Sequence, residues 1–232
     1  MKTSFWTKLL DLLSPRLCVV CGRRLSAEEA VLCHRCMLHI PLTHFSEHPL
    51  DNALARLFWG LFPIERATAS FFYEPHSEFA ELVYSLKYRN HPEIGQHLGR
   101  IVARDLQAEC FFEGIDAVVP VPISRQRRRS RGYNQSHEIC LGISQQTGLP
   151  VLDGVVERLD FKQSQTRLNP FERRDNVANA FRLIAPDRIA HRHLLLVDDV
   201  VTTGSTIIAC AQQLAQVEGV KISVFALGYS KS

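Results

Sequence analysis

The sequence predicts an α/β protein with a mainly parallel, doubly wound sheet and a small N-terminal ribbon held by four cysteines. Three observations support this prediction. Apolar, strand-like runs alternate with helical patterns through the second half of the chain. Two of these runs lead into polar loops that open a helix, as ligand-binding loops do at the edge of a parallel sheet. Two Cys-x-x-Cys pairs stand close together near the N-terminus.

The clearest strand–loop–helix unit lies in residues 194–219. Apolar residues 194–197 fit a strand that is covered on both faces, and Asp198 and Asp199 follow where that strand should leave the core. Apolar residues then recur at three- and four-residue spacing, which predicts a helix ending near Gly219. The turn before the helix contains Thr202, Thr203, Gly204, Ser205 and Thr206.

This turn has the chemistry of a phosphate site. A helix start offers unpaired N–H groups and the positive end of the helix dipole, the hydroxyls add donors, and Gly204 lets the backbone approach a ligand. Asp198 and Asp199 would repel phosphate but accept hydrogen bonds from a ribose diol. A ribose 5-phosphate satisfies both halves. The alternative is an ordinary turn with a capping hydroxyl and a solvated acidic pair.

Length and composition indicate one ordinary domain with a small appendage. The 232 residues are 46% hydrophobic, enough for a sizeable core. We expect an N-terminal helix and ribbon in residues 1–45, a linker in 46–66 and the main domain in 67–232. No apolar run is long enough for a membrane span. The apolar residues among positions 5–13 are too interrupted for a signal peptide and predict an amphipathic helix, so we expect a cytoplasmic protein.

The remaining elements are predicted from apolar periodicity and from proline and glycine positions. Pro92 fits the first turn of a helix, and Gly148 fits the end of another. Helices are expected at 51–61, 79–86, from 92 to about 102, and from about 136 to 148. Strands are expected at 67–73, 115–121, 151–159, 189–197 and 220–227.

The N-terminal cysteines have the spacing of a metal site. Cys18 and Cys21 are separated by eleven residues from Cys33 and Cys36. Four thiolates are a preferred ligand set for structural Zn²⁺, and a closed four-thiolate site would fold a segment that lacks its own core. The alternatives are reduced motifs without metal, or one redox dithiol. The odd total of seven cysteines fits reduced thiols better than a disulfide framework.

Positive charge is concentrated at one place. The net charge is +3, and residues 125–131 hold five arginines, without which 22 basic residues would face 24 acidic ones. These arginines follow the predicted strand 115–121, so we expect a basic loop at the same sheet edge as Asp198. Such a loop fits pyrophosphate or a nucleic-acid backbone, and its alternative is a solvated basic surface.

A polar stretch between about residues 160 and 180 is long for a plain connection. Arg173, Arg174 and Asn176 lie in it. We interpret the stretch as a lid over the site, and the alternative is a tolerated surface insertion.

The segment from Val197 to Thr206, Val-Asp-Asp-Val-Val-Thr-Thr-Gly-Ser-Thr, resembles the phosphoribosyl pyrophosphate (PRPP) signature of type I phosphoribosyltransferases. That resemblance implies a phosphoribosyltransferase-type sheet, with the acidic pair on the ribose hydroxyls and the turn on the 5-phosphate. No P-loop or G-x-G-x-x-G motif competes with it.

Further motifs make most of the chain similar to the bacterial ComF/GntX family. They are the four-cysteine ribbon, Leu86-Lys87-Tyr88, Pro120-Val121-Pro122, Arg131-Gly132-Tyr133-Asn134-Gln135, Arg173-x-x-Asn176-Val177 and Ala180-Phe181. Members of this family are linked to natural competence and to the use of external single-stranded DNA. Many carry a double ribbon, whereas this chain has one set of four cysteines.

The resemblance implies two hypotheses. In the first, the protein is a phosphoribosyltransferase: PRPP binds with Mg²⁺, Asp198 and Asp199 are the catalytic residues, Lys87, Arg125 and Arg127 neutralise pyrophosphate, and the acceptor is an unidentified nitrogen compound. In the second, the domain binds PRPP or a related ribose phosphate but serves DNA uptake together with other uptake proteins. Single-stranded DNA would then contact Arg127, Arg128, Arg129, Arg131 and Tyr133.

Overall fold

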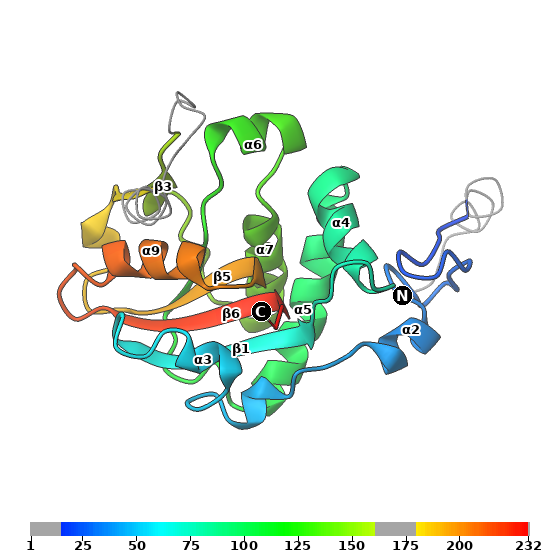
Figure 1. Cartoon of the computed structure of the whole chain (residues 1–232), viewed down its shortest axis with the longest axis horizontal. Helices are drawn as coiled ribbons and strands as arrows, with labels where there is room; N and C mark the ends of the chain where they lie inside the picture. Colours follow the sequence, from blue (N-terminus) through cyan, green and yellow to red (C-terminus); the bar gives the residue numbers. More distant parts are fainter. Residues whose placement is uncertain (1–14, 161–179, 232) are drawn as a thin grey trace.

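The computed structural model describes residues 15–160 and 180–231. Its centre is a four-stranded sheet in the order β1-β6-β5-β2, in which every neighbouring pair is parallel (Figure 1). All four strands therefore end at one edge of the sheet. The strands are β1 (Ile64–Phe72), β2 (Ala117–Pro120), β5 (His193–Val201) and β6 (Lys221–Tyr229).

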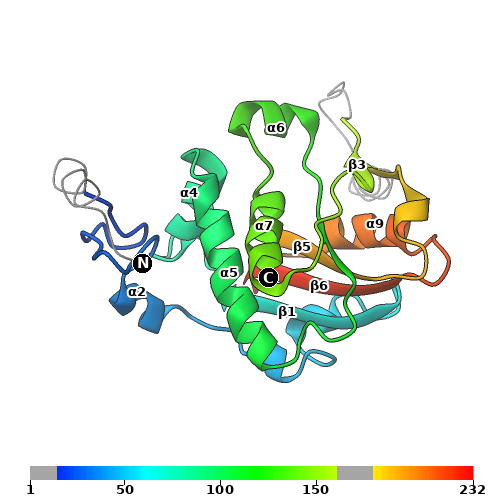
Figure 2. The same cartoon turned by 180° about the vertical axis from the view of Figure 1, so that it is seen from behind.

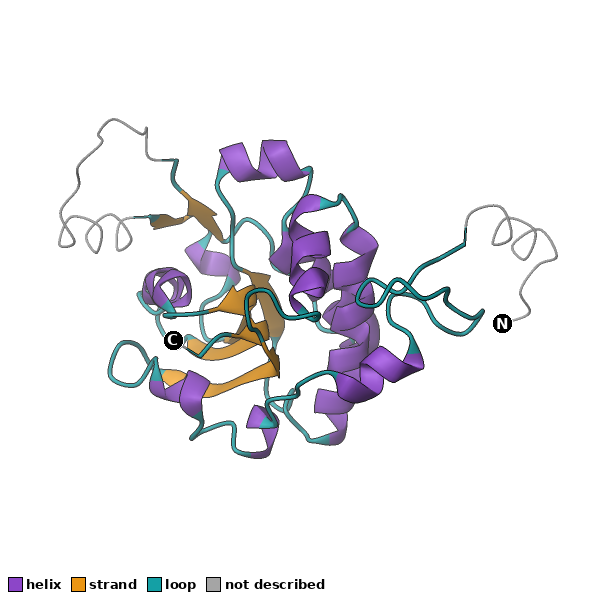
Figure 3. Cartoon of the chain, turned by 45° about the vertical axis from the view of Figure 1, so that its right-hand side comes forward, coloured by secondary structure: helices purple, strands orange, loops and turns teal. Residues whose placement is uncertain are grey.

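Helices cover both faces of this sheet, as the sequence predicts (Figure 3). Alternate residues of β5 belong to two separate hydrophobic clusters: Leu194 and Leu196 pack with α9, and Leu195 and Val197 pack with α4, α5 and α7. A strand buried on both faces explains why its sequence is continuously apolar. The helices are α4 (Ala80–Tyr88), α5 (Pro92–Ala108), α7 (Gln135–Thr147) and α9 (Ser205–Leu214).

Two of these helices pack unusually closely. α5 and α7 lie side by side on one face of the sheet (Figure 2). A Cβ atom added at Gly142 would lie 2.2 Å from the carbonyl oxygen of Gln96, and one added at Gly99 would lie 2.4 Å from that of Ile139. Glycine at both positions is thus what allows the backbones to meet. This contact fixes the start of α7, which reaches the site described below.

Smaller elements complete the described chain. The antiparallel pair of β3 (Val156–Arg158) and β4 (Phe181–Leu183) forms a separate two-stranded sheet, so the predicted strand at 151–159 is wrong over its first half. Val151 makes only a single bridge to Val118. The predicted helix at 51–61 shortens to one turn, α3 (Ala53–Arg56), capped by the Asn52 side chain. The others are α2 (His34–His39), α6 (Arg125–Arg131), η1 (Phe45–Glu47) and η2 (Pro186–Arg188).

The segment predicted as a linker is attached to the main sheet. Ala67 of β1 donates its backbone N–H to the Pro49 carbonyl at 2.8 Å, and the Asn52 side chain donates to the Ala67 carbonyl at 2.8 Å. β1 itself begins at Ile64, inside the range 46–66. In the part of the chain that the structure describes, no helix combines the length and the apolar character that a bilayer crossing requires. The predicted N-terminal amphipathic helix lies outside the described residues.

Candidate functional site

The acidic doublet lies within β5 rather than after it. We expected the strand to end at Val197, but Asp198 is in register with Ala226 of β6 and the ladder continues to Val201. The extension follows from β6, which offers backbone partners as far as Tyr229. As a result both carboxylates are partly withdrawn from solvent, and Asp199 is only 9% exposed.

Each carboxylate has partners from a different helix. Asp198 accepts hydrogen bonds from the Ser136 hydroxyl at 3.1 Å and from the Asp199 N–H at 2.8 Å. Asp199 forms an ion pair with Lys87, with 3.1 Å between Nζ and Oδ1. Ser136 stands in the first turn of α7, and Lys87 stands in the last turn of α4. Three elements thus converge on the carboxyl end of β5, and among the predicted site residues that the structure describes, Lys87 is the one whose side chain contacts the doublet.

The doublet has unusual acid–base behaviour. Burial, and then the charge of Asp199, raise the pKa of Asp198 to about 7, although Lys87 and the two hydrogen bonds oppose the rise. Near neutral pH the pair therefore carries less than two negative charges. A partly protonated doublet repels a phosphorylated ligand less, and it can donate as well as accept a hydrogen bond.

A turn rich in hydroxyl groups joins β5 to α9. Gly204 is the N-cap of α9 and adopts φ +74°, a conformation that favours glycine, and a Cβ there would lie 3.0 Å from Phe58. The side chains of Thr202, Thr203 and Ser205 are exposed and that of Thr206 is partly exposed. Thr203 and Ser205 lie 3.2 Å apart between hydroxyl oxygens. The start of α9 therefore presents hydroxyl groups to solvent.

The arginine cluster is a helix, not the loop that we predicted. The Ser124 hydroxyl caps α6 by accepting the Arg127 N–H, and Gly132 ends the helix with φ +83°. Arginine is itself a good helix former. Arg125 is largely exposed, with its guanidinium 3.7 Å from Glu157. Arg127, Arg128 and Arg129 are exposed too, so α6 forms a solvent-facing basic ridge.

Tyr133 has a positioning contact. Its hydroxyl donates to the carbonyl oxygen of Leu86 at 2.6 Å, and its ring packs against the hydrophobic cluster beneath α4. This bond joins the approach to α7 to the end of α4, directly beside Lys87. The predicted lid residues Arg173, Arg174 and Asn176 lie outside the described residues.

Arg158 is a further cation that the sequence did not suggest. It is half-buried on β3, with its guanidinium carbon 5.4 Å from the centre of the Phe181 ring. Burial and the nearby Arg127 lower its pKa, while Asp198 opposes that shift. Arg158 therefore lies in the same electrostatic environment as the doublet and the basic ridge. A lone arginine in a short strand has no sequence signature, and Ser136 likewise carries none.

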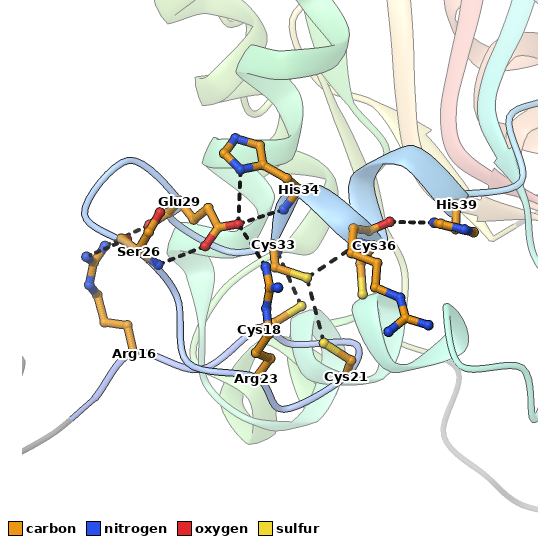
Figure 4. Close-up of polar contacts among 11 residues, drawn as sticks. Arg16, Cys18, Cys21, Arg23, Ser26, Glu29, Cys33, His34, Cys36 and His39 are labelled. Atoms are coloured by element: carbon orange, nitrogen blue, oxygen red, sulfur yellow. Dashed lines mark hydrogen bonds and ion pairs between the residues drawn. The ribbon is translucent and has the colours of Figure 1, made fainter.

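The four N-terminal cysteines do come together (Figure 4). The Sγ atoms of Cys18, Cys21, Cys33 and Cys36 all lie within 4.8 Å of one another, and those of Cys21 and Cys33 are 3.7 Å apart. Tetrahedral Zn–S bonds of about 2.3 Å place sulfurs about 3.8 Å apart, so the donor set fits a single tetrahedral ion. Backbone N–H groups approach the sulfurs of Cys18 and Cys33, at 3.4 and 3.5 Å.

A buried glutamate organises the loop between the two cysteine pairs. Glu29 accepts the N–H groups of Ser26 and His34 at 2.8 and 2.7 Å, and it pairs with Arg23 at 3.3 Å (Figure 4). These backbone donors lower the pKa of Glu29 to about 2. The same loop is tied by Arg16, which donates to the Glu29 carbonyl. The eleven intervening residues thus form a defined turn rather than a loose link.

The fold and site define an α/β protein with a parallel sheet, an acidic doublet beside a hydroxylated helix start, and a four-cysteine ribbon. DNA utilization protein YhgH of Escherichia coli (strain K12) is 31% identical over 214 residues, which cover 91% of this chain and 89% of that protein. Competence protein F of Haemophilus influenzae is 31% identical over 150 residues, which cover 63% of this chain and 66% of that protein. The chain belongs to the ComF family, to which these two relatives point.

No family model matches the chain. Among solved structures, adenine phosphoribosyltransferase from Leishmania tarentolae covers 78% of this chain and 89% of its own length, with 12% identity and a TM-score of 0.38.

Proposed function

We propose that the protein binds PRPP or a related ribose phosphate at the carboxyl end of β5, and that it acts in the cytoplasm in the use of external single-stranded DNA. The DNA role rests on family membership, since relatives carry the names DNA utilization protein and competence protein. The ligand rests on the geometry of the doublet and the turn. PRPP would bring Mg²⁺ as a counter-ion of its pyrophosphate.

The ligand proposal rests on one observation: hydrogen-bond acceptors and a helix start suited to an anion lie together at the end of β5. Asp198 and Asp199 offer carboxylate oxygens, and the following residues open α9 with Gly204 in a positive-φ conformation and exposed hydroxyls. The diol of a ribose would bind the first group and its 5-phosphate the second. Lys87, now on Asp199, would turn toward the pyrophosphate when the diol takes its place.

The remaining positive charges would hold the pyrophosphate. Arg125 and Arg127 were expected there, and Arg158 joins them because it shares the electrostatic environment of Asp198. Arginine forks suit phosphate oxygens. Arg125 would first have to leave Glu157.

Calorimetry with PRPP and Mg²⁺ tests this proposal. We expect the wild type to bind and an Asp198→Asn/Asp199→Asn variant to lose at least about tenfold in affinity, since each diol hydrogen bond to a charged group contributes about 1.5–3 kcal/mol. Asp105→Asn/Asp187→Asn is the matched control, because it removes two exposed aspartates and leaves the doublet intact. The proposal would be contradicted if the wild type did not bind PRPP, or if the doublet variant and the control variant bound it equally well.

An active phosphoribosyltransferase is the second candidate, favoured by Lys87 in contact with Asp199 and by Arg158 in the electrostatic environment of Asp198. Positioning and charge neutralisation are the tasks that such a reaction asks of a protein. Asp198 and Asp199 would be the catalytic residues, and an unidentified nitrogen compound the acceptor. The test is pyrophosphate release from PRPP in the presence of candidate bases and amines. If the wild type released pyrophosphate no faster than the Asp198→Asn/Asp199→Asn variant, catalysis would be ruled out and only the binding role would stand.

We also propose that the four cysteines hold Zn²⁺ and that the role of the ion is structural. All four ligand positions of a tetrahedral ion would be filled by sulfur, so no position stays open for a substrate. The ribbon contributes few residues to the core beyond the cysteines themselves. Segments with so small a hydrophobic core are commonly stabilised by a structural metal ion.

The DNA proposal assigns the backbone contacts to the basic ridge of α6. Its candidate residues are Arg127, Arg128, Arg129 and Arg131, and we expect binding to weaken steeply with salt because phosphate contacts release counterions. Fluorescence polarisation with a labelled oligonucleotide compares the wild type with Arg127→Ala/Arg128→Ala. Unchanged affinity of that variant would move the DNA surface elsewhere.

A further inference from the structure

Two exposed tyrosines stand together on α4, next to the basic ridge. Tyr84 and Tyr88 are 51% and 62% exposed, and their ring centroids lie 5.0 Å apart. Residues four apart face the same side of a helix, so the rings form one surface. The opposite side of α4 is occupied by Leu82, Val83 and Leu86, which are buried. The core therefore does not account for the two tyrosines.

Arginines bracket this tyrosine pair. The guanidinium carbon of Arg131, from α6, lies 5.2 Å from the centre of the Tyr88 ring, and that of Arg89 lies 5.7 Å from the centre of the Tyr84 ring. Arg131 is also bonded to Gln135 at 2.9 Å, and Arg89 is paired with Glu81. Both guanidinium groups are thus held in place from a second side. The result is a continuous Arg131–Tyr88–Tyr84–Arg89 row, which we call the tyrosine row.

The row continues the basic ridge. Arg131 is the last residue of α6 and belongs to both surfaces, and α4 and α6 rise next to one another from the same side of the molecule (Figures 1 and 2). Five of the seven residues of α6 are arginines. A polyanion lying along α6 would therefore pass over exposed aromatic rings where the helix ends.

We propose that the tyrosine row is a base-stacking platform for single-stranded DNA, with two neighbouring bases on Tyr84 and Tyr88 and the backbone along α6. This inference rests on the proposed DNA role and adds to it the residues that would contact the unpaired bases. Aromatic rings beside a cationic groove are the usual means of holding single strands without regard to sequence. Double-stranded DNA keeps its bases stacked inside the helix, so the row would discriminate against it.

Tyr133 was the aromatic partner expected from the sequence. It is the less suitable one, because its hydroxyl is engaged by Leu86 and its ring packs on the core. The exposed rings come instead from α4, which lies about fifty residues earlier in the chain. Only the packing of α4 beside α6 brings them to the ridge.

The test is fluorescence polarisation with a labelled 20-nucleotide oligo(dT) at several salt concentrations. We expect Tyr84→Ala/Tyr88→Ala to weaken binding by about tenfold or more, with an unchanged slope of log K against log salt. Tyr84→Phe/Tyr88→Phe keeps the rings and should bind like the wild type. Arg128→Ala/Arg129→Ala should instead flatten the slope, by about 0.7 for each phosphate that the variant no longer neutralises.

Trp59→Ala is the matched control. Trp59 is an aromatic residue that is 52% exposed and has Arg56 over its ring at 5.9 Å, but it follows α3 on the other side of the sheet. Its loss should leave binding unchanged. Equal binding by the Tyr→Ala variant and the wild type overturns the platform while leaving the DNA role standing. Failure of the wild type to bind oligo(dT) overturns both, and weak binding by the Tyr→Phe variant overturns stacking in favour of hydroxyl contacts.

Discussion

At the scale of single residues, the unusual group is Asp198. Its carboxylate sits inside a strand, accepts two hydrogen bonds and lies next to a second carboxylate. Burial and that neighbour raise its pKa from 3.8 to about 7. Carboxylates whose pKa is shifted in this way are concentrated at functional sites. Burying such a group has a cost in folding free energy. This cost can be measured without knowing any ligand.

We predict that Asp198→Asn stabilises the protein at pH 8 and does so less at pH 5. Between about pH 4 and 7 the folded state binds more protons at Asp198 than the unfolded state does, so its contribution to stability falls as pH rises through that window. Asparagine cannot ionise, so the Asp198→Asn variant does not lose this stability as the pH rises. Thermal unfolding at both pH values measures the difference, at about 2–4 °C for each kcal/mol.

Asp105→Asn serves as the control for this comparison, since Asp105 is exposed on α5. A variant-minus-wild-type difference in Tm that is the same at pH 5 and pH 8 would show that Asp198 is ionised with an ordinary pKa.

At the scale of elements, the sequence predicted the four central strands and the four long helices because their apolar patterns are local. It did not predict where β5 ends, because Asp198 and Asp199 remain in the strand only through their pairing with β6. The helical form of the arginine cluster was missed although Ser124 and Gly132 mark its two ends. Ser136 reaches the doublet through tertiary packing, which no spacing in the sequence records.

The close contact of α5 and α7 makes a second prediction. Gly142→Ala places a methyl group on the backbone of α5, so we expect a loss of about 1–3 kcal/mol or more in the free energy of unfolding. Ser136 should shift with α7, so PRPP affinity should fall as well. Denaturant unfolding and calorimetry measure the two effects. The control, Gln145→Ala, changes an exposed residue of the same helix and should stay within about 0.5 kcal/mol.

If Gly142→Ala were as stable as the wild type, the two helices would not be in backbone contact, and the position of Ser136 would need another explanation.

At the scale of the whole molecule, the ribbon and the sheet are built on different principles. The sheet has hydrophobic clusters on both faces, whereas the ribbon depends on four cysteines and on the Glu29 turn. Three of the ribbon cysteines, Cys18, Cys33 and Cys36, nevertheless join the cluster under α4 and α5, so the ribbon is packed on the main domain. The division into residues 1–45, 46–66 and 67–232 stays a prediction, although β1 begins before residue 67.

We predict one tightly bound zinc per chain in protein purified without chelator. Removing it, or replacing Cys33 by serine, should expose residues 16–36 to protease while far-ultraviolet circular dichroism keeps the signal of the central sheet and helices. Metal analysis and limited proteolysis measure these effects. Cys110→Ser is the control, since Cys110 is exposed and lies away from the cluster. Substoichiometric zinc, or unfolding of the entire chain without it, would contradict this division of roles.

The central claim is that a ribose phosphate binds where β5 meets α9. The most direct test is an experimental structure of the protein crystallised with PRPP and Mg²⁺. We expect the ribose hydroxyls on Asp198 and Asp199, the 5-phosphate at the backbone N–H groups that follow Gly204, and Lys87 released from Asp199 toward the pyrophosphate. Ligand density elsewhere, or a Lys87–Asp199 pair left intact beside an unfilled turn at saturating PRPP, would contradict the account.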